Sequence, residues 1–313
     1  MNPLIKKVLV CLDATEMDAT LIQFAAFVAQ AESVESIHFV NVITKTQLPT
    51  KLRKEFPDLI EKALVDRRRE LEKKVIEHFD LTLDVKVKIA VEQGPLPSKL
   101  ILDLANKHNI DVIVVGRKKS IRSNSVVTQR LARRASCSLM IVPQKEYASV
   151  QKLMVATDFS RDSYGAMNAA IDAATREAER GNQVEVICHH SYQVPVGYHY
   201  TGRSFEESAH VMEENARKRY KRFIHRIDTK LIKVTPSFTL AKNDDLVTSI
   251  YEAAKEYQVD FVFIGGKGKS ASTALFPIGT NTEKLISVDS EIPLLVVRSK
   301  HRNAGIIDML QRI

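Results

Sequence analysis

The sequence predicts an α/β protein of two tandem doubly wound domains, each built on a five-stranded parallel sheet. The first observation is length, because 313 residues suit two domains of ordinary size. The second is an internal repeat, since one order of strands and helices is written twice. The third is strand composition: segments such as 111–116 (DVIVVG) are almost wholly apolar, as strands covered on both faces must be.

The two halves match element by element. Each begins with a basic residue and a short apolar strand that ends at an Asp, and an Ala-rich helix follows. The expected elements after that helix are second strands at 35–43 and 182–190, long charged helices at 57–79 and 205–227, third strands at 84–94 and 233–243, helices at 96–110 and 245–259, fourth strands at 111–116 and 260–266, and last strands at 138–143 and 292–297. Strands that alternate with helices imply right-handed crossovers between parallel strands. We therefore expect domains at 1–146 and 147–300, with a C-terminal tail at 301–313.

Composition limits the function classes. The net charge of +8 favours anionic partners, or it is a background bias with no partner attached. Trp is absent and aromatic residues are 6%, so a base-stacking surface for nucleic acid is disfavoured. The N-terminus does not read as a signal peptide, and no apolar run is long enough to span a membrane. Three scattered cysteines without CxxC spacing favour buried thiols in a reducing compartment, so we expect a cytoplasmic protein.

The segment after the fourth strand of the second half carries the clearest chemical signal. It reads FIGGKGKSASTALFPIGTNTEKLI (263–286), an apolar strand that ends in closely spaced glycines before Gly279 and Thr280 open a helix. Glycines let the backbone approach a phosphate, and a helix N-terminus adds amides and partial positive charge. In a doubly wound domain the crevice at the carboxyl ends of the strands is the usual ligand site. Asp158 ends the first strand of this half, where it could contact a ribose or adenine, cap the following helix, or do both.

On these residues both halves resemble universal stress protein domains, and the whole chain resembles the tandem members of that family. The family's ATP motif reads G-x2-G-x9-G-[ST]; here Gly265-x2-Gly268 matches the front and Gly279-Thr280 the back, with ten residues between them. One additional loop residue costs little closure entropy. The resemblance implies a Rossmann-like fold of the adenine nucleotide alpha hydrolase kind and pairing of the halves about a pseudo-two-fold axis.

The resemblance also implies a nucleotide site in the second half. Thr157 and Asp158 fall at the first-strand contacts, and His190 falls near the adenine contact, where the family usually has an apolar residue. Phosphate contacts are expected from the fourth-strand turn and the helix that follows it. The full set of expected nucleotide-binding residues is Thr157, Asp158, His190, Ile264, Gly265, Gly268, Gly279, Thr280 and Asn281.

The first half departs from this pattern. Asp13 matches the family Asp, but no glycine follows Gly116, and Ser125-Val126 stand where Gly-Ser is expected. The basic residues of 117–134 fill this place, and we interpret them as a solvated loop and helix face because no aromatic residues interleave with them. We expect one ATP site in the chain, in the second half.

The predicted function is that of an adenine-nucleotide-binding stress or signalling factor that uses ATP, with or without Mg²⁺. The expected partners are the adenine nucleotide and, within the chain, the other domain, and a homodimer is a further candidate assembly. The alternative is a non-nucleotide structural or partner-binding module, or a carrier of another small ligand, with Phe276 or His190 filling the adenine pocket. No pair of nucleophile and base is evident, so no catalytic residues are expected. Any ATP hydrolysis is expected to be slow at most. No metal site is expected either, because His189 and His190 are adjacent on a strand and point to opposite faces.

Overall fold

The chain forms two compact units, Met1–Ala148 and Ser149–Ser299. The computed structural model describes residues 5–31, 33–44, 54–117, 122–241, 245–266, 279–288 and 290–298. The C-terminal tail at 301–313 and the loop residues Gly268 and Phe276 lie outside these ranges. The break between the units falls two residues after the boundary expected at 146.

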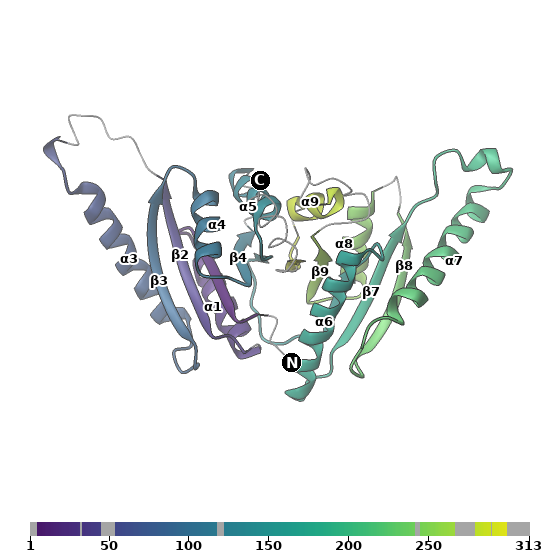
Figure 1. The fold of residues 1–313 in the computed structure, drawn as a ribbon, viewed down its shortest axis with the longest axis horizontal. Helices are drawn as coiled ribbons and strands as arrows, with labels where there is room; N and C mark the ends of the chain where they lie inside the picture. Colours follow the sequence, from purple (N-terminus) through teal and green to yellow (C-terminus); the bar gives the residue numbers. More distant parts are fainter. Residues whose placement is uncertain are drawn as a thin grey trace, which may run out of the picture. The chain divides into compact units, whose positions relative to one another are not determined.

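The first unit follows the predicted alternation of strands and helices (Figure 1). Its elements are β1 (Lys7–Leu12), α1 (Met17–Ala31), β2 (Ser36–Thr44), α3 (Leu59–His78), β3 (Lys86–Gly94), α4 (Pro97–Lys107), β4 (Val112–Arg117), α5 (Arg122–Arg134) and β5 (Ser138–Pro143). The strands are parallel in the order β3-β2-β1-β4-β5. This order reverses between β1 and β4, as in other doubly wound sheets.

The second unit repeats the plan. Its elements are β6 (Lys152–Ala156), α6 (Arg161–Glu179), β7 (Glu185–Tyr192), the 3₁₀ turn η1 (Tyr198–Thr201), α7 (Phe205–Ile224), β8 (Lys233–Leu240), α8 (Leu246–Glu256), β9 (Phe261–Gly265), α9 (Thr280–Ser287) and β10 (Leu294–Val297). Its parallel strands lie in the order β10-β9-β6-β7-β8. The predicted fold class, two tandem α/β domains with parallel sheets, is confirmed.

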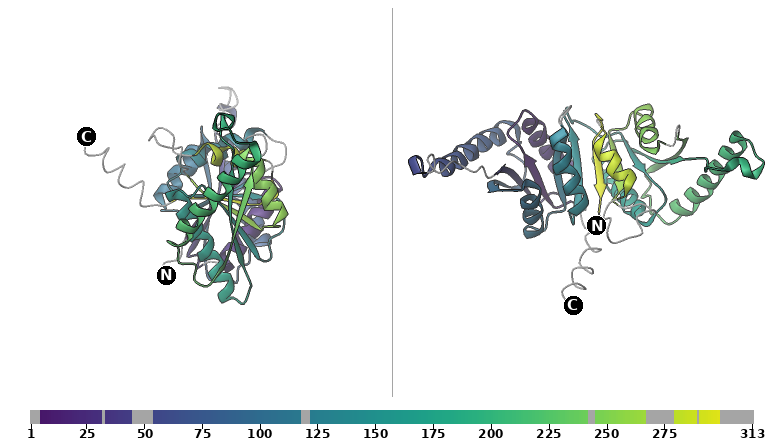
Figure 2. Two further views of the ribbon diagram at one scale, coloured as in Figure 1. Left: turned by 90° about the vertical axis from the view of Figure 1, so that its right-hand side faces the viewer. Right: turned by 90° about the horizontal axis from the view of Figure 1, so that it is seen from above.

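Helices cover both faces of each sheet (Figure 2). In the first unit α1 packs against α3 on one face and α4 packs against α5 on the other. In the second unit α6 and α7 share one face, while α8 packs against α9 on the opposite face. Burial on both faces explains why strands such as β4 and β9 read as continuous apolar runs.

Strand register makes the two units comparable residue by residue. Lys7 of β1 pairs with Ser36 of β2, and Lys152 of β6 pairs with Glu185 of β7. Ser36 and Glu185 in turn pair with the first residues of β3 and β8. Positions that hold the same place in this register are called equivalent below.

The cysteines and the basic segment behave largely as expected. Cys137 and Cys188 are buried free thiols, and Cys11 is a free thiol at intermediate exposure. Burial raises the pKa of the Cys11 and Cys188 thiols well above the ordinary value. On α5, the side chains of Arg130, Arg133 and Arg134 are exposed, which agrees with a solvated helix face. Arg117 is different: it ends β4 and is 9% exposed, so placing it in an exposed basic loop was wrong.

Candidate functional site

A small pocket lies at the carboxyl ends of β6 and β9 in the second unit. Its volume is about 90 Å³. It is lined by the end of β6 and the start of α6 (Ala156, Thr157, Asp158, Ser163), by α8 (Ile250), by the end of β9 (Ile264, Gly265), and by the start of α9 (Gly279, Thr280, Asn281, Thr282). It therefore occupies the crevice where the strand order reverses.

The first wall is the loop between β6 and α6, which hydrogen bonds within the loop hold in place. Asp158 Oδ1 accepts from the Ser160 amide at 2.9 Å and from the Ser163 hydroxyl at 2.8 Å. Ser160 is the N-cap of α6. The interpretation of Asp158 as the cap of this helix is therefore wrong. Asp158 instead fixes the shape of the loop.

The loop turns through Phe159, which has a left-handed backbone at φ 59°. A non-glycine residue there is strained and needs outside support. The Phe159 amide donates to Thr157 Oγ1 at 2.9 Å, and the Phe159 ring packs on the rings of His190 and Phe223. The guanidinium of Arg219, from α7, lies over the Phe159 ring at 4.9 Å.

Arg219 also donates to the Asp158 carbonyl oxygen, so α7 holds the loop from outside. Burial lowers the pKa of the Arg219 guanidinium, and the nearby Asp158 carboxylate opposes that shift. The cation is thus engaged with the loop backbone and the aromatic ring, on the side away from α9.

The second wall is the end of β9 together with the start of α9. The Gly279 amide donates to the Gly266 carbonyl at 3.0 Å, and the Thr282 hydroxyl donates to the Gly265 carbonyl at 3.2 Å. The first hydrogen bond inside α9 runs from the Glu283 amide to the Gly279 carbonyl. The amides of Thr280 and Asn281 precede that bond and have no acceptor among the described residues, as expected at a helix start.

Gly265 is required by packing. A Cβ built at Gly265 would lie 2.7 Å from the Asp162 carbonyl carbon and 2.8 Å from its oxygen, in the first turn of α6. Real Cβ atoms do not approach backbone this closely, so β9 and α6 can pack as they do only with glycine at this position. The first glycine of the motif therefore has a structural role of its own.

The structure brings most of the sequence-predicted site together. Seven predicted residues line the pocket: Thr157, Asp158, Ile264, Gly265, Gly279, Thr280 and Asn281. His190 does not line it, because its Nδ1 is 2.7 Å from the Thr157 carbonyl oxygen and its ring lies 4.6 Å from the Phe159 ring. Gly268 falls outside the described residues.

Five contributors were not predicted from the sequence. Arg219 holds the loop from outside, and four further residues line the pocket: Ala156, Ser163, Ile250 and Thr282. Ser163 could have been found from the repeat, because Asp18 stands at the equivalent place and likewise accepts from the loop, at the Asp13 amide. Arg219 lies far from the loop in sequence on a charged helix, so no local pattern marks it.

The pocket's charge suits an anion better than a cation. Asp158 is the only acidic residue among the described residues that line it, and one of its oxygens already accepts two hydrogen bonds. The α9 start contributes partial positive charge and the amides of Thr280 and Asn281, which have no acceptor among the described residues. No cluster of three or more His, Cys, Asp or Glu side chains that could hold a metal occurs in the part of the chain that the structure describes.

The chain matches one known protein family in sequence and several solved structures in fold. A sequence model described as the universal stress protein family matches residues 4–143 and again 149–298. A universal stress protein from Archaeoglobus fulgidus DSM 4304 is similar in structure, with TM-score 0.58 and 17% identity over 93% of this chain and 96% of that one. A functionally unknown protein from Pseudomonas aeruginosa PAO1 gives TM-score 0.60 and 13% identity over 99% and 98%.

A universal stress protein solved in complex with cAMP matches less well, at TM-score 0.33 and 16% identity over 45% of this chain and 98% of that one. No curated protein sequence matches the chain. In the described ranges, no helix has both the length and the apolar character that crossing a membrane needs. Because the family model matches both halves over nearly their whole length, the chain belongs to the universal stress protein family.

Proposed function

We propose that the second unit binds an adenine nucleotide, ATP, through the pocket between β6, β9 and α9, and that the protein acts as a ligand-responsive stress or signalling factor. The observation that carries the proposal is the convergence of seven predicted residues from three separate segments on one pocket. Family membership by itself leaves the ligand undecided.

The start of α9 supports the phosphate end of this proposal. The Thr280 and Asn281 side chains are exposed, and their amides precede the first intrahelical bond of α9. A phosphate at this helix start would accept hydrogen bonds from these two amides and lie at the favourable end of the helix dipole. Mg²⁺, where present, would be held chiefly by the phosphates, because Asp158 is the one acidic side chain among the described lining residues.

The pocket volume favours a second candidate, a non-nucleotide partner-binding module. About 90 Å³ holds roughly three waters, and ligand pockets usually measure about 300–1000 Å³. The described walls thus enclose space for a phosphate group and not for a whole nucleotide. Two side chains were candidates for closing the pocket. His190 does not fill it, because its ring contacts the Thr157 carbonyl, and Phe276 lies outside the described residues.

Calorimetric titration of the intact chain with Mg²⁺ and ATP tests the proposal, with Asn281→Asp as the main variant. The new carboxylate would lie in the first turn of α9, where an acid favours the helix, while it repels a bound phosphate. We expect binding of about one equivalent to the intact chain and affinity at least about tenfold lower in the variant.

Gln151→Glu is the matched control. It adds the same charge at the exposed start of β6, the opposite end of that strand from the pocket. This variant should bind ATP like the intact chain. Equal losses in both variants would mean that ATP is held only by the net positive charge, and absence of binding to the intact chain would favour the partner-binding alternative.

Three accompanying expectations remain predictions. They are the absence of a nucleotide site in the first unit, the pairing of the two units about a pseudo-two-fold axis, and cytoplasmic residence. Light scattering measures the mass of the particle and small-angle scattering measures its pair-distance distribution, so the two together test domain pairing and any homodimer.

A further inference from the structure

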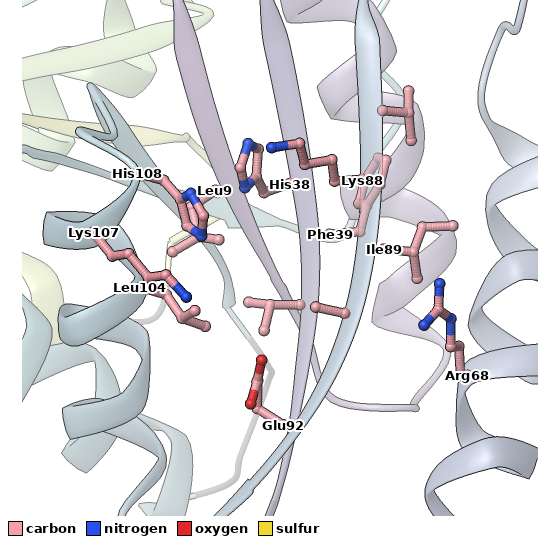
Figure 3. A pocket seen from close by; sticks show the side chains of 13 residues that line it. Leu9, His38, Phe39, Arg68, Lys88, Ile89, Glu92, Leu104, Lys107 and His108 are labelled. Carbon is pink, nitrogen blue, oxygen red and sulfur yellow. The ribbon is translucent and has the colours of Figure 1, made fainter.

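A second, larger hollow lies in the first unit along the strands β1 to β3, beside α4, and it extends to Arg68 of α3 on the other side of β3. Its volume is about 440 Å³, within the range of small-molecule pockets. Its walls are largely apolar, with Leu9, Val40, Ala90 and Leu104 among the lining residues. Figure 3 shows two imidazoles and two lysine side chains among these walls. We call this hollow the histidine pocket.

Two histidines meet inside the histidine pocket. His38 comes from β2 and His108 follows the end of α4, and their ring centroids are 4.8 Å apart. His38 is only 9% exposed, yet neither imidazole has a hydrogen-bond partner among the described residues. A buried imidazole that lines a cavity without a protein partner points to a ligand or water that supplies one.

Cations surround the two rings from three elements. The positive charges of Lys7 on β1 and Lys88 on β3 disfavour protonation of both imidazoles. The charge of Lys107 on α4 disfavours protonation of His108. Burial first, and then these positive charges together with the partner ring, lower the pKa of His38 to about 4. The same kinds of cause lower the pKa of His108.

Other charged residues of the pocket lie away from the two rings. Figure 3 shows Glu92 at the far end of the pocket and Arg68, from α3, on the other side of β3. Glu92 is not among the groups that shift the pKa of either histidine. The environment of the imidazoles is therefore one-sidedly positive within the described residues.

The second unit lacks this arrangement. The residues equivalent to His38, Lys88 and His108 are Ile187, Thr235 and Tyr257. Val40 and Ala90, which line the histidine pocket, correspond to His189 and Ser237, whose side chains are bonded to each other at 3.0 Å. The histidine pocket is thus a feature of the first unit and not of the repeated plan.

We propose that the histidine pocket binds a small organic dianion of the phosphate-monoester class. Lys88 and Lys107 bring two positive charges to one cavity, and the imidazoles beside them can donate N–H hydrogen bonds to an anion. A metal cation would be repelled by the two ammonium groups, and two imidazoles alone do not complete the usual coordination shell. The apolar walls would pack against the organic part of the ligand. The site is separate from the α9 site and does not depend on it.

Proton uptake accompanies binding. Without ligand both imidazoles are neutral at pH 7, because their pKa values are lowered. A bound dianion favours the charged imidazoles and raises those pKa values. Affinity therefore increases as pH falls from neutrality toward about 6, where a phosphate monoester begins to lose its second negative charge.

Histidine-detected NMR tests the proposal on the intact chain. Imidazole signals of His38 and His108 are followed against pH in chloride, then at equal ionic strength with phenyl phosphate. We expect saturable shifts at both residues and a pKa of His38 that moves from about 4 toward 6.5. His225, exposed at the end of α7, is the internal control and should not respond.

Two matched variants locate the charge effect. Lys88→Met should weaken phenyl phosphate binding about tenfold, because it removes one charge-assisted contact. Lys86→Met removes the same charge from the same strand but lies outside the pocket lining, so its affinity should be close to that of the intact chain. Asn281→Asp should leave the His38 response unchanged, which separates this site from the proposed nucleotide site.

The proposal is overturned if His38 and His108 do not shift, or if they shift only linearly and together with His225. Equal losses in Lys86→Met and Lys88→Met would also overturn it, since they would indicate general attraction to a basic surface. Saturable binding of Zn²⁺ without any phenyl phosphate response would make the two imidazoles a metal site and contradict the dianion assignment.

Discussion

The loops after the first strands of the two units adopt the same backbone shape with different side chains. Ala14 and Phe159 occupy equivalent positions, and both have left-handed backbones at φ 62° and 59°. In the first unit Asn41 donates to the Leu12 carbonyl at 2.8 Å, and in the second the equivalent His190 lies 2.7 Å from the Thr157 carbonyl. The side chain of His190 thus has the same role as that of Asn41, which is to support the loop after the first strand through a backbone carbonyl.

At the ends of the fourth strands, the two units keep the same residue at one position and differ at the next. Gly116 and Gly265 are equivalent, and a Cβ at either would collide with the first turn of the helix that follows the first strand. After them the units diverge, with buried Arg117 in one and Gly266 in the other. The repeat thus keeps glycine where packing needs it, and the two units differ at the next residue, beside the proposed nucleotide site of the second unit.

The largest predicted effect concerns His189, a core residue that unit 1 replaces with Val40. Its side chain is fully buried between Ser237 and Ser191, and burial lowers its pKa to about 4. An unfolded histidine takes up a proton near 6.5, so the unfolded state binds more protons between pH 6.5 and 4. Acidification through that window should remove about 3 kcal/mol from the stability of the second unit.

The double variant His189→Val with Ser237→Ala tests this by installing the first-unit pair, Val40 and Ala90. Urea unfolding by circular dichroism at several pH values is the measurement, with hydrogen exchange to assign the transition to a unit. We expect the acid loss to shrink because the imidazole that takes up the proton is removed. Ser191, the other partner of His189, keeps its hydrogen bond to the Ser249 hydroxyl at 3.0 Å. An unchanged pH profile would mean that other groups cause the acid sensitivity.

The glycine comparison gives the next effect. At Gly265 an added Cβ meets Asp162 backbone atoms, whereas at Gly116 it meets the flexible Met17 side chain, with Cγ at 2.5 Å. Backbone cannot move aside as a methionine can, so Gly265→Ala should cost about 2 kcal/mol and Gly116→Ala about 1 kcal/mol or less. Urea midpoints of the two variants measure the difference. Equal costs would contradict the close approach of β9 to α6.

The sequence predicted the element order and most element bounds because these depend on local periodicity, repeated twice. It predicted seven lining residues because the family motif places them at strand ends and at one helix start. It could not place His190, whose position depends on the strained turn at Phe159. It also missed the histidine pocket, since His38 and His108 are distant in sequence, although aligning the halves sets His38 against Ile187.

The first helices of the two units are anchored differently, which gives a smaller effect. Asp18 is fully buried in α1 and paired with Lys74 of α3 at 2.7 Å, while unit 2 has Ser163 at the equivalent position. Lys74→Met leaves a buried carboxylate unpaired and should cost about 1.5 kcal/mol, since one third of the Lys74 side chain is exposed to water. Asp18→Ser removes that charge and should cost less. Urea unfolding of both variants decides the order, and a costlier Asp18→Ser would refute it.

The smallest effect compares the starts of α4 and α8. In α8 the Asp245 side chain accepts from the Val247 and Thr248 amides, each at 3.1 Å, whereas in α4 the equivalent Leu96 has no cap and precedes Pro97. Leu96 has an extended backbone and is 36% exposed, so an Asp fits there and would cap α4. Leu96→Asp should stabilise the first unit by about 0.5–1 kcal/mol, and Asp245→Leu should destabilise the second by about 1 kcal/mol. Thermal unfolding of the two variants and of the double swap measures both. If Leu96→Asp lowered the stability, the apolar contacts of Leu96 would outweigh a helix cap at this position.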